Sequence, residues 1–217
     1  MNRKRFEQIT TPQGKAIYPW LTEPDRKFNP DGEYKINLRL NNEKAEEVIN
    51  QLEDIYEKHY AECCKEQGKK KLKRHDLPCV EVTGDNEELT GEWDFKFKLK
   101  AKWKSRDGKE GTQRPILYDA KNNPLTNDNR PKVGSGSTVR ISAEVYTWFT
   151  PTLGVGMSLR PKAVQILELI EYGGGGSAKG FGFEVEEGFE ALASEMSSST
   201  SNANDVADEA FTDDMPF

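Results

Sequence analysis

A row of positively charged side chains occupies one face of the segment Trp93–Arg106. Because side chains alternate across a β-strand, the even-numbered positions from 96 onward lie on the same face. Such a row repels itself unless an anion lies over it, so it predicts a surface that binds a polyanion. One or two lysines could instead guard a sheet edge against aggregation, but six cations without an intervening acid fit that alternative poorly. The six are Lys96, Lys98, Lys100, Lys102, Lys104 and Arg106.

The opposite face of the same segment is apolar. Large hydrophobic side chains alternate with the cations, which favours burial in a core over exposure. The segment is therefore predicted to be one long strand with a buried face and a cationic face. The apolar face carries Trp93, Phe95, Phe97, Leu99, Ala101 and Trp103.

Aromatic side chains on otherwise polar faces are the second candidate feature. In the predicted strand Thr138–Thr150, alternate residues from Val139 to Val145 are apolar and predict a core face, which leaves the aromatic residues of the other face available to a ligand. Unpaired bases stack on such rings, and each stack contributes roughly 1–3 kcal/mol to binding. The candidates are Tyr146 and Trp148, with Arg140 on their face, and Tyr18 and Trp20 of the predicted edge strand Ala16–Leu21.

The charge of the chain is divided unevenly. Residues 173–217 hold one lysine and ten acidic residues, a net charge of -9, which leaves +3 for residues 1–172. We expect a DNA-binding domain over 1–172 and a disordered acidic tail over 173–217, joined by a flexible glycine linker. The tail could compete with a polyanion for the basic body, or could serve solubility alone. Solubility does not explain the aromatic last residue of the final peptide, Asp213, Asp214, Met215, Pro216 and Phe217, which a partner with an apolar pocket and a basic rim could bind.

Metal binding and catalysis have weaker support. The pairs His59/Cys63 and His75/Cys79 have a spacing that could hold zinc, but Cys63 continues the apolar stripe of a predicted helix. The chain has neither a His-Glu-x-x-His nor a Gly-x-Ser-x-Gly motif. Three cysteines without an evident signal peptide favour reduced thiols, and no segment approaches the roughly 18 apolar residues of a membrane span. We expect a protein that is not an enzyme, needs no cofactor and contacts no membrane.

The pattern of elements predicts a mostly β fold. Further strands are expected at Tyr34–Leu40, Leu77–Val82, Gln113–Tyr118 and Met157–Glu171, and an amphipathic helix from about Glu43 to Gln67. Asn41 or Asn42 can cap that helix, and Gly68 ends it. Five or more strands around one inserted helix predict an OB-fold-like Greek-key barrel.

Several of these segments, in this order, resemble the single-stranded DNA-binding proteins of T-odd bacteriophages. They are residues 29–35, Phe95–Lys98, Val145–Trp148 and the acidic end with its final Phe. The resemblance implies an OB-fold with an inserted helix, DNA contacts from Lys96 and Lys98, and base stacking by Tyr146. The chain departs from the family in having Lys100 where an aromatic residue can stand and Asp31 where a basic residue can stand.

The expected function follows from both lines of reasoning. We expect a protein that coats and protects single-stranded DNA in phage replication, recombination and repair and promotes strand annealing. The resemblance further implies a homodimer, in the cytoplasm of an infected bacterium, whose tail recruits the phage DNA polymerase and primase-helicase. The tail tip also resembles that of bacterial single-stranded DNA-binding proteins, so host proteins that bind such tips are possible partners. The alternatives are an annealing or recruitment adaptor that binds DNA weakly and an accessory subunit of a nucleic-acid enzyme.

Overall fold

The computed structural model describes residues 6–84, 86–105, 108–126 and 129–171. Within these ranges, no helix is long and apolar enough to cross a membrane. The elements, in chain order, are β1 (Glu7–Thr10), β2 (Gly14–Asp25), β3 (Glu33–Asn41), α1 (Asn42–Glu66), β4 (Cys79–Thr83), β5 (Leu89–Lys100), β6 (Lys102–Lys104), β7 (Glu110–Thr112), β8 (Ile116–Tyr118), β9 (Pro124–Leu125), β10 (Thr138–Thr150) and β11 (Gly154–Glu168).

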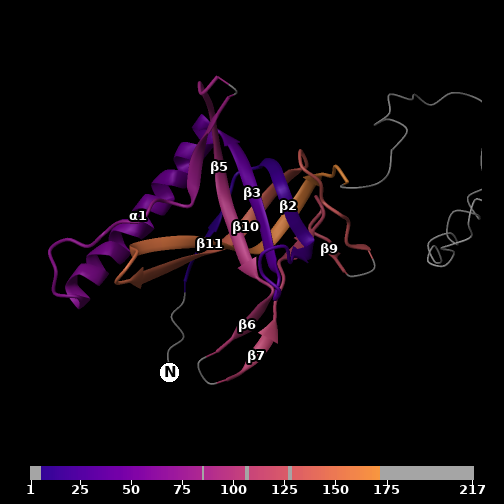
Figure 1. The fold of residues 1–217 in the computed structure, drawn as a ribbon. Helices are drawn as coiled ribbons and strands as arrows, with labels where there is room; N and C mark the ends of the chain where they lie inside the picture. The colour runs from indigo at the N-terminus through magenta and orange to yellow at the C-terminus, as the bar shows by residue number, and fades with distance from the viewer. Residues whose placement is uncertain (1–5, 85, 106–107, 127–128, 172–217) are drawn as a thin grey trace, which may run out of the picture. The chain divides into compact units, whose positions relative to one another are not determined.

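Five strands close into a barrel (Figure 1). The ring runs β2-β3-β5-β11-β10 and returns to β2, where Gly14 and Lys15 pair with the start of β10. All of its pairings are antiparallel except the one between β5 and β11, at Phe97 and Leu159. This is the five-stranded Greek-key arrangement of an OB-fold, which confirms the predicted fold class.

Alternating apolar residues fill the barrel. Phe95 and Phe97 of β5 are fully buried, and so are Val139 and Ile141 of β10. Helix α1 adds a stripe of side chains that packs into the same core, because residues three or four apart share one face of a helix. The buried residues of that stripe are Ala45, Val48, Leu52, Ile55, Tyr56 and Cys63.

Capping residues set the ends of α1 as predicted. The side chain of Asn41 accepts a hydrogen bond from the backbone N–H of Lys44. Gly68, with φ of +62°, ends the helix in the left-handed region that glycine adopts without strain. The helix therefore occupies the interval between β3 and β4 for which the sequence predicted it.

The predicted long strand Trp93–Arg106 is interrupted at Ala101. β3 begins at Glu33, whose pairing partner is Lys100, so beyond Lys100 the chain has no pairing partner in β3. It bends at Ala101 and forms a separate hairpin, β6–β7, which projects from the end of β5 (Figure 1). The predicted single line of six cations is therefore wrong: β5 carries three of them, β6 carries two, and Arg106 lies outside the described residues.

The predicted aromatic strand Ala16–Leu21 is part of β2, which lies between β10 and β3 in the barrel. Only Gly14 and Lys15 of β2 pair with β10, so Ala16–Leu21 pairs with β3 alone and is locally an edge, as predicted. Pro19 is tolerated because the pairing with β10 ends at Lys15 and a bulge separates Ile17 from Trp20 on the β3 side. Tyr18, within the bulge, has φ of +48° and is 73% exposed. The bulge also turns Ile17 and Trp20 toward the same outer face, instead of the opposite faces predicted.

Candidate nucleic-acid interface

The outer face of β3 and β5 carries the cations that the barrel leaves exposed. Lys96 pairs with Asn37, Lys98 with Lys35, and Lys100 with Glu33. Directly paired residues of neighbouring strands point to the same side of a sheet. The predicted alternation is therefore confirmed from Phe95 to Lys100, with apolar residues inside and lysines outside.

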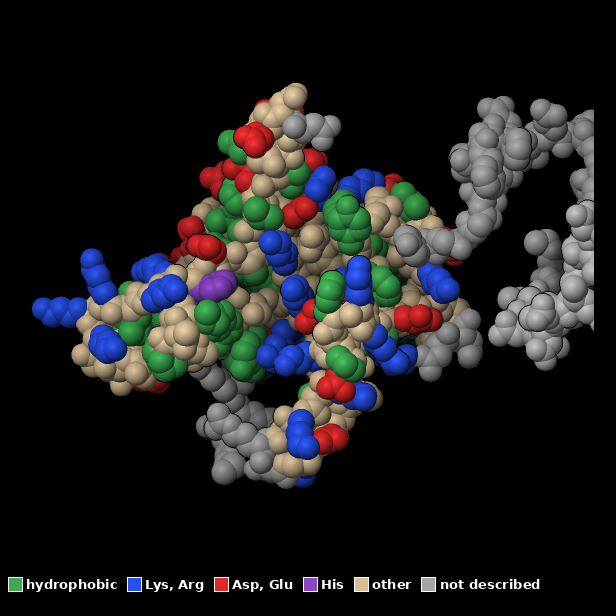
Figure 2. Space-filling model, viewed as in Figure 1, with side chains coloured by type: hydrophobic (Ala, Val, Ile, Leu, Met, Phe, Trp, Pro, Cys, Tyr) green, Lys and Arg blue, Asp and Glu red, His purple; other side chains and the backbone are tan. Residues whose placement is uncertain are grey.

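These lysines form the floor of a groove of about 650 Å³, here called the β5 groove. Its walls are formed by Tyr146 of β10, by residues 157–160 of β11 and by residues 75–80, and Trp103 and Gln113 line it near Lys100. In Figure 2, Lys and Arg side chains gather around the middle of the displayed face, above the projecting hairpin. The charged and aromatic residues of the β5 groove are Lys96, Lys98, Lys100, Arg160, Glu33, Asp76, His75, Tyr146 and Trp103.

The charge of the β5 groove is positive because its three floor lysines are not neutralised. Neither they nor Arg160 form an ion pair with any described residue. The neighbouring cations of β3 differ. Lys35 pairs with Asp25, and the hydrogen bond from Lys35 is the main reason that the pKa of Asp25 lies below its ordinary value. On the outer face of β3 and β5, the described cations that lack an ion pair are therefore those of β5.

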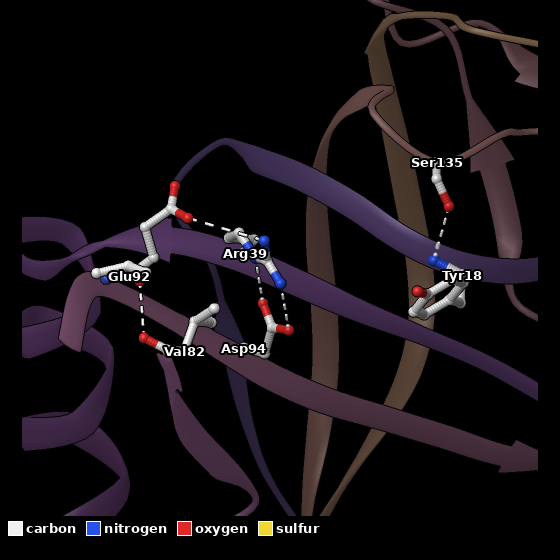
Figure 3. A network of polar contacts seen from close by, with 7 residues as sticks. Tyr18, Arg39, Val82, Glu92, Asp94 and Ser135 are labelled. Atoms are coloured by element: carbon white, nitrogen blue, oxygen red, sulfur yellow. Dashed lines mark hydrogen bonds and ion pairs between the residues drawn. The ribbon is translucent and has the colours of Figure 1, made fainter. Parts of the chain in front are cut away.

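The Arg39–Asp94 pair marks the other end of this row (Figure 3). The Nε of Arg39 donates to one carboxylate oxygen of Asp94 at 2.8 Å, and Nη2 donates to the other at 2.9 Å. This two-point contact raises the pKa of Arg39 above its ordinary value, and Glu92 lies 3.8 Å away. Asp94 is almost fully buried, so the pair ends the exposed cationic row without adding charge to it.

Tyr146, which was predicted to stack on bases, lines the wall of the β5 groove. The guanidinium carbon of Arg160 lies 3.4 Å from the centroid of its ring, and the ring of Phe6 lies 4.9 Å away, tilted by 52°. A flat guanidinium on a ring extends the surface on which a base can stack. Arg160 was not predicted, because a single arginine in an alternating strand gives no signal in the sequence.

Trp148 lies behind the part of the wall that His75 and Ser158 form. Its indole N–H donates to Ser158 Oγ at 3.3 Å, and its ring meets the edge of His75, with centroids 5.3 Å apart. His75 and Ser158 line the β5 groove, so Trp148 supports the wall rather than facing the groove.

The wall around His75 is tied to α1 and β11. The backbone N–H of His75 and the hydroxyl of Tyr56 both donate to the carbonyl of Val155, each at 2.9 Å. Arg74 forms a two-point ion pair with Glu57 and lies 3.9 Å above the Tyr60 ring. These contacts fix the position of the wall, and the inserted helix α1 therefore helps to hold it.

The remaining candidate residues lie elsewhere. Tyr18 and Trp20 line a second pocket of about 370 Å³ with Lys132 and Ser135, whose Oγ accepts a hydrogen bond from the Tyr18 backbone (Figure 3). Trp20 is nevertheless only two strands from Lys98, because both pair with Lys35. Arg140 is exposed and paired with Gln165, six residues before Tyr146. Lys102 and Lys104 are on the hairpin in ion pairs with Asp31 and Glu110.

The expected core position of Trp103 is contradicted, since its side chain is 42% exposed and lines the β5 groove. Trp93 does pack against the core. The tail residues Asp213, Asp214, Met215, Pro216 and Phe217, and the tail 173–217 as a whole, lie outside the described residues.

The two His/Cys pairs do not converge on a metal site. Within the described residues, no three His, Cys, Asp or Glu side chains are grouped as a metal ion requires. His59 Nε2 lies 3.4 Å from Cys63 Sγ on α1, whereas Cys79 lies at the β5 groove. Burial raises the pKa of the Cys79 thiol to about 11, which keeps it protonated at neutral pH.

The fold agrees with comparisons against known proteins. A curated relative, the single-stranded DNA-binding protein of Enterobacteria phage T3, is 29% identical over 193 residues, which cover 79% of each chain. The crystal structure of gp2.5, the single-stranded DNA-binding protein of bacteriophage T7, matches with a TM-score of 0.64 and 21% identity, over 87% of this chain and 100% of that one.

Another solved structure has a similar fold. The single-stranded DNA-binding protein of bacteriophage Enc34, in complex with single-stranded DNA, matches with a TM-score of 0.54 and 15% identity, over 77% of this chain and 89% of that one. Finally, the family model for the single-stranded DNA-binding protein of bacteriophage T7 matches residues 13–169, almost the whole barrel. The chain therefore belongs to the bacteriophage T7 single-stranded DNA-binding protein family.

Proposed function

We propose that this protein binds single-stranded DNA in the β5 groove, with little preference for base sequence. The observation that carries the proposal is the combination of three unpaired lysines on β5 with the stacked Tyr146 and Arg160 in the adjacent wall. Lysines in an extended row attract the phosphates, and the ring with its guanidinium receives a base. Neither contact distinguishes one base from another.

The position of the groove supports the same proposal. OB-folds bind oligonucleotides mainly on the face formed by their second and third strands. In this barrel those strands are β3 and β5, which present the three lysines. The name of the T3 relative and the DNA complex of the Enc34 protein give independent support.

The biological role that we propose is non-catalytic. The protein coats and protects single strands during phage replication, recombination and repair, and it promotes annealing of complementary strands. It acts as a homodimer in the cytoplasm of the infected bacterium. Its acidic segment recruits the phage DNA polymerase, the primase-helicase and host proteins that bind similar tips.

Titration of labelled oligomers tests the DNA-binding proposal. We expect single-stranded DNA to bind with a dissociation constant that rises steeply between about 50 mM and 200 mM salt, because phosphate contacts release counterions. Duplex DNA of the same length should bind more weakly, because its bases are not available for stacking. Fluorescence anisotropy gives both constants, and quenching of tryptophan fluorescence reports base contact. Equal affinity for single strands and duplex would contradict the proposal.

Removal of residues 197–217 is expected to raise affinity for single-stranded DNA several-fold at low salt. The deleted segment contains five acidic residues, Asp205, Asp208, Glu209, Asp213 and Asp214, which compete with phosphates for the basic body. The gain should vanish at high salt, where both interactions are screened. Anisotropy titrations of the full chain and the truncated chain at two salt concentrations measure it. Equal affinities at low salt exclude competition.

The truncated chain also tests recruitment. Purified phage DNA polymerase and primase-helicase should bind the full chain and lose that binding on truncation, as measured by surface plasmon resonance. A variant lacking only Phe217 should keep the DNA affinity of the full chain and lose partner binding. Unchanged partner binding in that variant would show that the final aromatic residue is not recognised.

A further inference from the structure

Trp103 is an aromatic side chain at the end of the β5 groove. It belongs to β6, directly after the β5 lysines, and its indole is 42% exposed. It is three positions after Lys100, so it stands roughly 10 Å further along the chain path. It lines the groove together with Gln113, whose side chain donates a hydrogen bond to the carbonyl of Lys100 at 2.9 Å. A DNA strand that runs along the β5 lysines from Lys96 toward Lys100 therefore reaches the indole of Trp103.

Gly111 holds the indole in place. It is the residue directly opposite Trp103 in the hairpin. A Cβ at this position would lie within 2.7–2.9 Å of three indole atoms, closer than side chains tolerate. The ring therefore lies flat against the backbone of β7, and only a residue without a side chain permits this contact.

The hairpin itself is anchored to the barrel. The backbone N–H of Ala101 donates to the carbonyl of Gly32, and that of Gln113 donates to the carbonyl of Ala101, both at 2.9 Å. Lys102 contacts Asp31 of the β2–β3 loop at 3.2 Å. The indole thus has a fixed position relative to the floor of the β5 groove.

A purely structural explanation is available for such a contact. Aromatic rings often cover glycines in neighbouring strands, and Trp148 covers Gly156 in the same way. However, Trp148 is half-buried behind His75, whereas Trp103 is exposed at the groove. Shielding of a glycine accounts for the contact but not for an indole at the end of the lysine row.

We infer that Trp103 is a second stacking platform, which receives an unpaired base of the strand bound along β5, and that Gly111 positions it. The inference rests on the proposed function, since it requires single-stranded DNA in the β5 groove. Tyr146 and Trp103 then contact bases of one strand, and the lysines between them contact its phosphates. The chemistry is base-independent, because every base offers a flat face.

The test uses the full-length protein and a fluorescent single-stranded oligomer, with Trp103→Ala, Trp103→Phe and Gly111→Ala as variants. We expect Trp103→Ala to weaken binding by about 5- to 100-fold and Trp103→Phe by less than about 3-fold, because phenylalanine still stacks. Gly111→Ala should weaken binding in the same direction by displacing the ring. The double variant should be no weaker than Trp103→Ala alone, since both changes remove one contact.

An abasic oligomer separates stacking from a structural role. It keeps the phosphates and lacks the bases, so wild type and Trp103→Ala should bind it equally. If the substitution instead weakens binding to normal and abasic oligomers alike, the tryptophan only supports the hairpin and the inference is wrong. Trp93→Phe is the matched control, because Trp93 hydrogen-bonds Asn42 away from the β5 groove and should leave affinity unchanged.

Two further outcomes are distinguishable. If the wild type binds single strands tightly and Trp103→Ala binds them equally well, this inference fails and the proposed function stands. If the wild type shows no preference for single strands, the proposed function itself fails. Circular dichroism and thermal melting of each variant show whether the barrel remains folded.

Discussion

Replacing Lys96 and Lys98 together by glutamate is expected to weaken binding of single-stranded DNA on the order of a hundredfold at low salt. Both side chains are exposed on the floor of the β5 groove and unpaired among the described residues. Reversal therefore removes two attractions and adds two repulsions directly under the phosphates. The loss should be similar for oligomers of different base sequence, because phosphate contacts position a strand without reading it. Anisotropy titrations with several mixed-sequence oligomers measure it.

The salt dependence gives a second, quantitative readout of the same contacts. In single strands, each phosphate contact contributes a slope of about -0.7 to the logarithm of affinity against the logarithm of salt concentration. Neutral glutamines at Lys96 and Lys98 should therefore make this slope shallower by about 1.4. An unchanged slope would mean that these lysines do not contact phosphates, whatever the loss in affinity.

The hairpin lysines provide the control for that experiment. Lys102 and Lys104 are the same residue type in the same stretch of sequence, but they pair with Asp31 and Glu110. Changing both to glutamine should cost much less affinity and leave the salt slope nearly unchanged. If both double variants behave alike, net charge rather than the β5 groove controls binding.

The sequence was sufficient to predict the regular parts of this fold. The 3.6-residue stripe from Val48 to Cys63 identified α1, and strict alternation from Phe95 to Lys100 identified both faces of β5. These signals are local, because each depends only on the period of one element against one core. The OB-like class followed from the order of such elements.

The errors occurred where partners distant in the sequence determine the structure. Alternation continues through Ala101 to Trp103, so nothing local marks the end of β5. That end is set by the start of β3 at Glu33, which pairs with Lys100. Likewise, the bulge at Tyr18 is a register shift in the pairing of β2 with β3, which the pattern of β2 alone does not mark. Pairing length is a property of two strands, and one strand's pattern cannot reveal it.

The site residues also divide into those with a local sequence signal and those whose position depends on distant partners. Lys96, Lys98 and Tyr146 were predicted from strand patterns, and the barrel brings them into one groove. Arg160 was missed because its importance comes from lying over the ring of Tyr146 on the neighbouring strand β10, a contact that the pattern of β11 alone does not reveal. Trp103 was assigned to the core because its neighbours in the pattern are buried.

Asp94→Asn is expected to have opposite effects on stability and on DNA binding. Asp94 is almost fully buried, and its carboxylate accepts two hydrogen bonds from Arg39. An amide can accept only one of them and carries no charge, so the free energy of unfolding should fall by about 1–3 kcal/mol. Urea denaturation followed by tryptophan fluorescence measures this loss.

The same change should strengthen binding of single-stranded DNA. Arg39 lies on the outer face of β3, with Asn37 between it and Lys35 along the strand, and at present Asp94 neutralises it. Removing that negative charge raises the net charge beside the lysine row by one, although Glu92 still lies 3.8 Å from Arg39, so affinity at low salt should rise several-fold. The gain should disappear at high salt, since it is electrostatic.

Glu92→Gln is the control for the Asp94 experiment. Glu92 also faces Arg39, but at 3.8 Å and with its side chain 45% exposed, so its contribution to stability should be below about 1 kcal/mol.

A double-mutant cycle on Arg39 and Asp94 isolates their mutual interaction from the effect of each residue alone. If Asp94→Asn lowers stability and affinity together, the pair serves to hold β3 and β5 in register for DNA. If affinity rises while stability falls, the Arg39–Asp94 pair stabilises the contact between β3 and β5 and lowers the positive charge of their outer face.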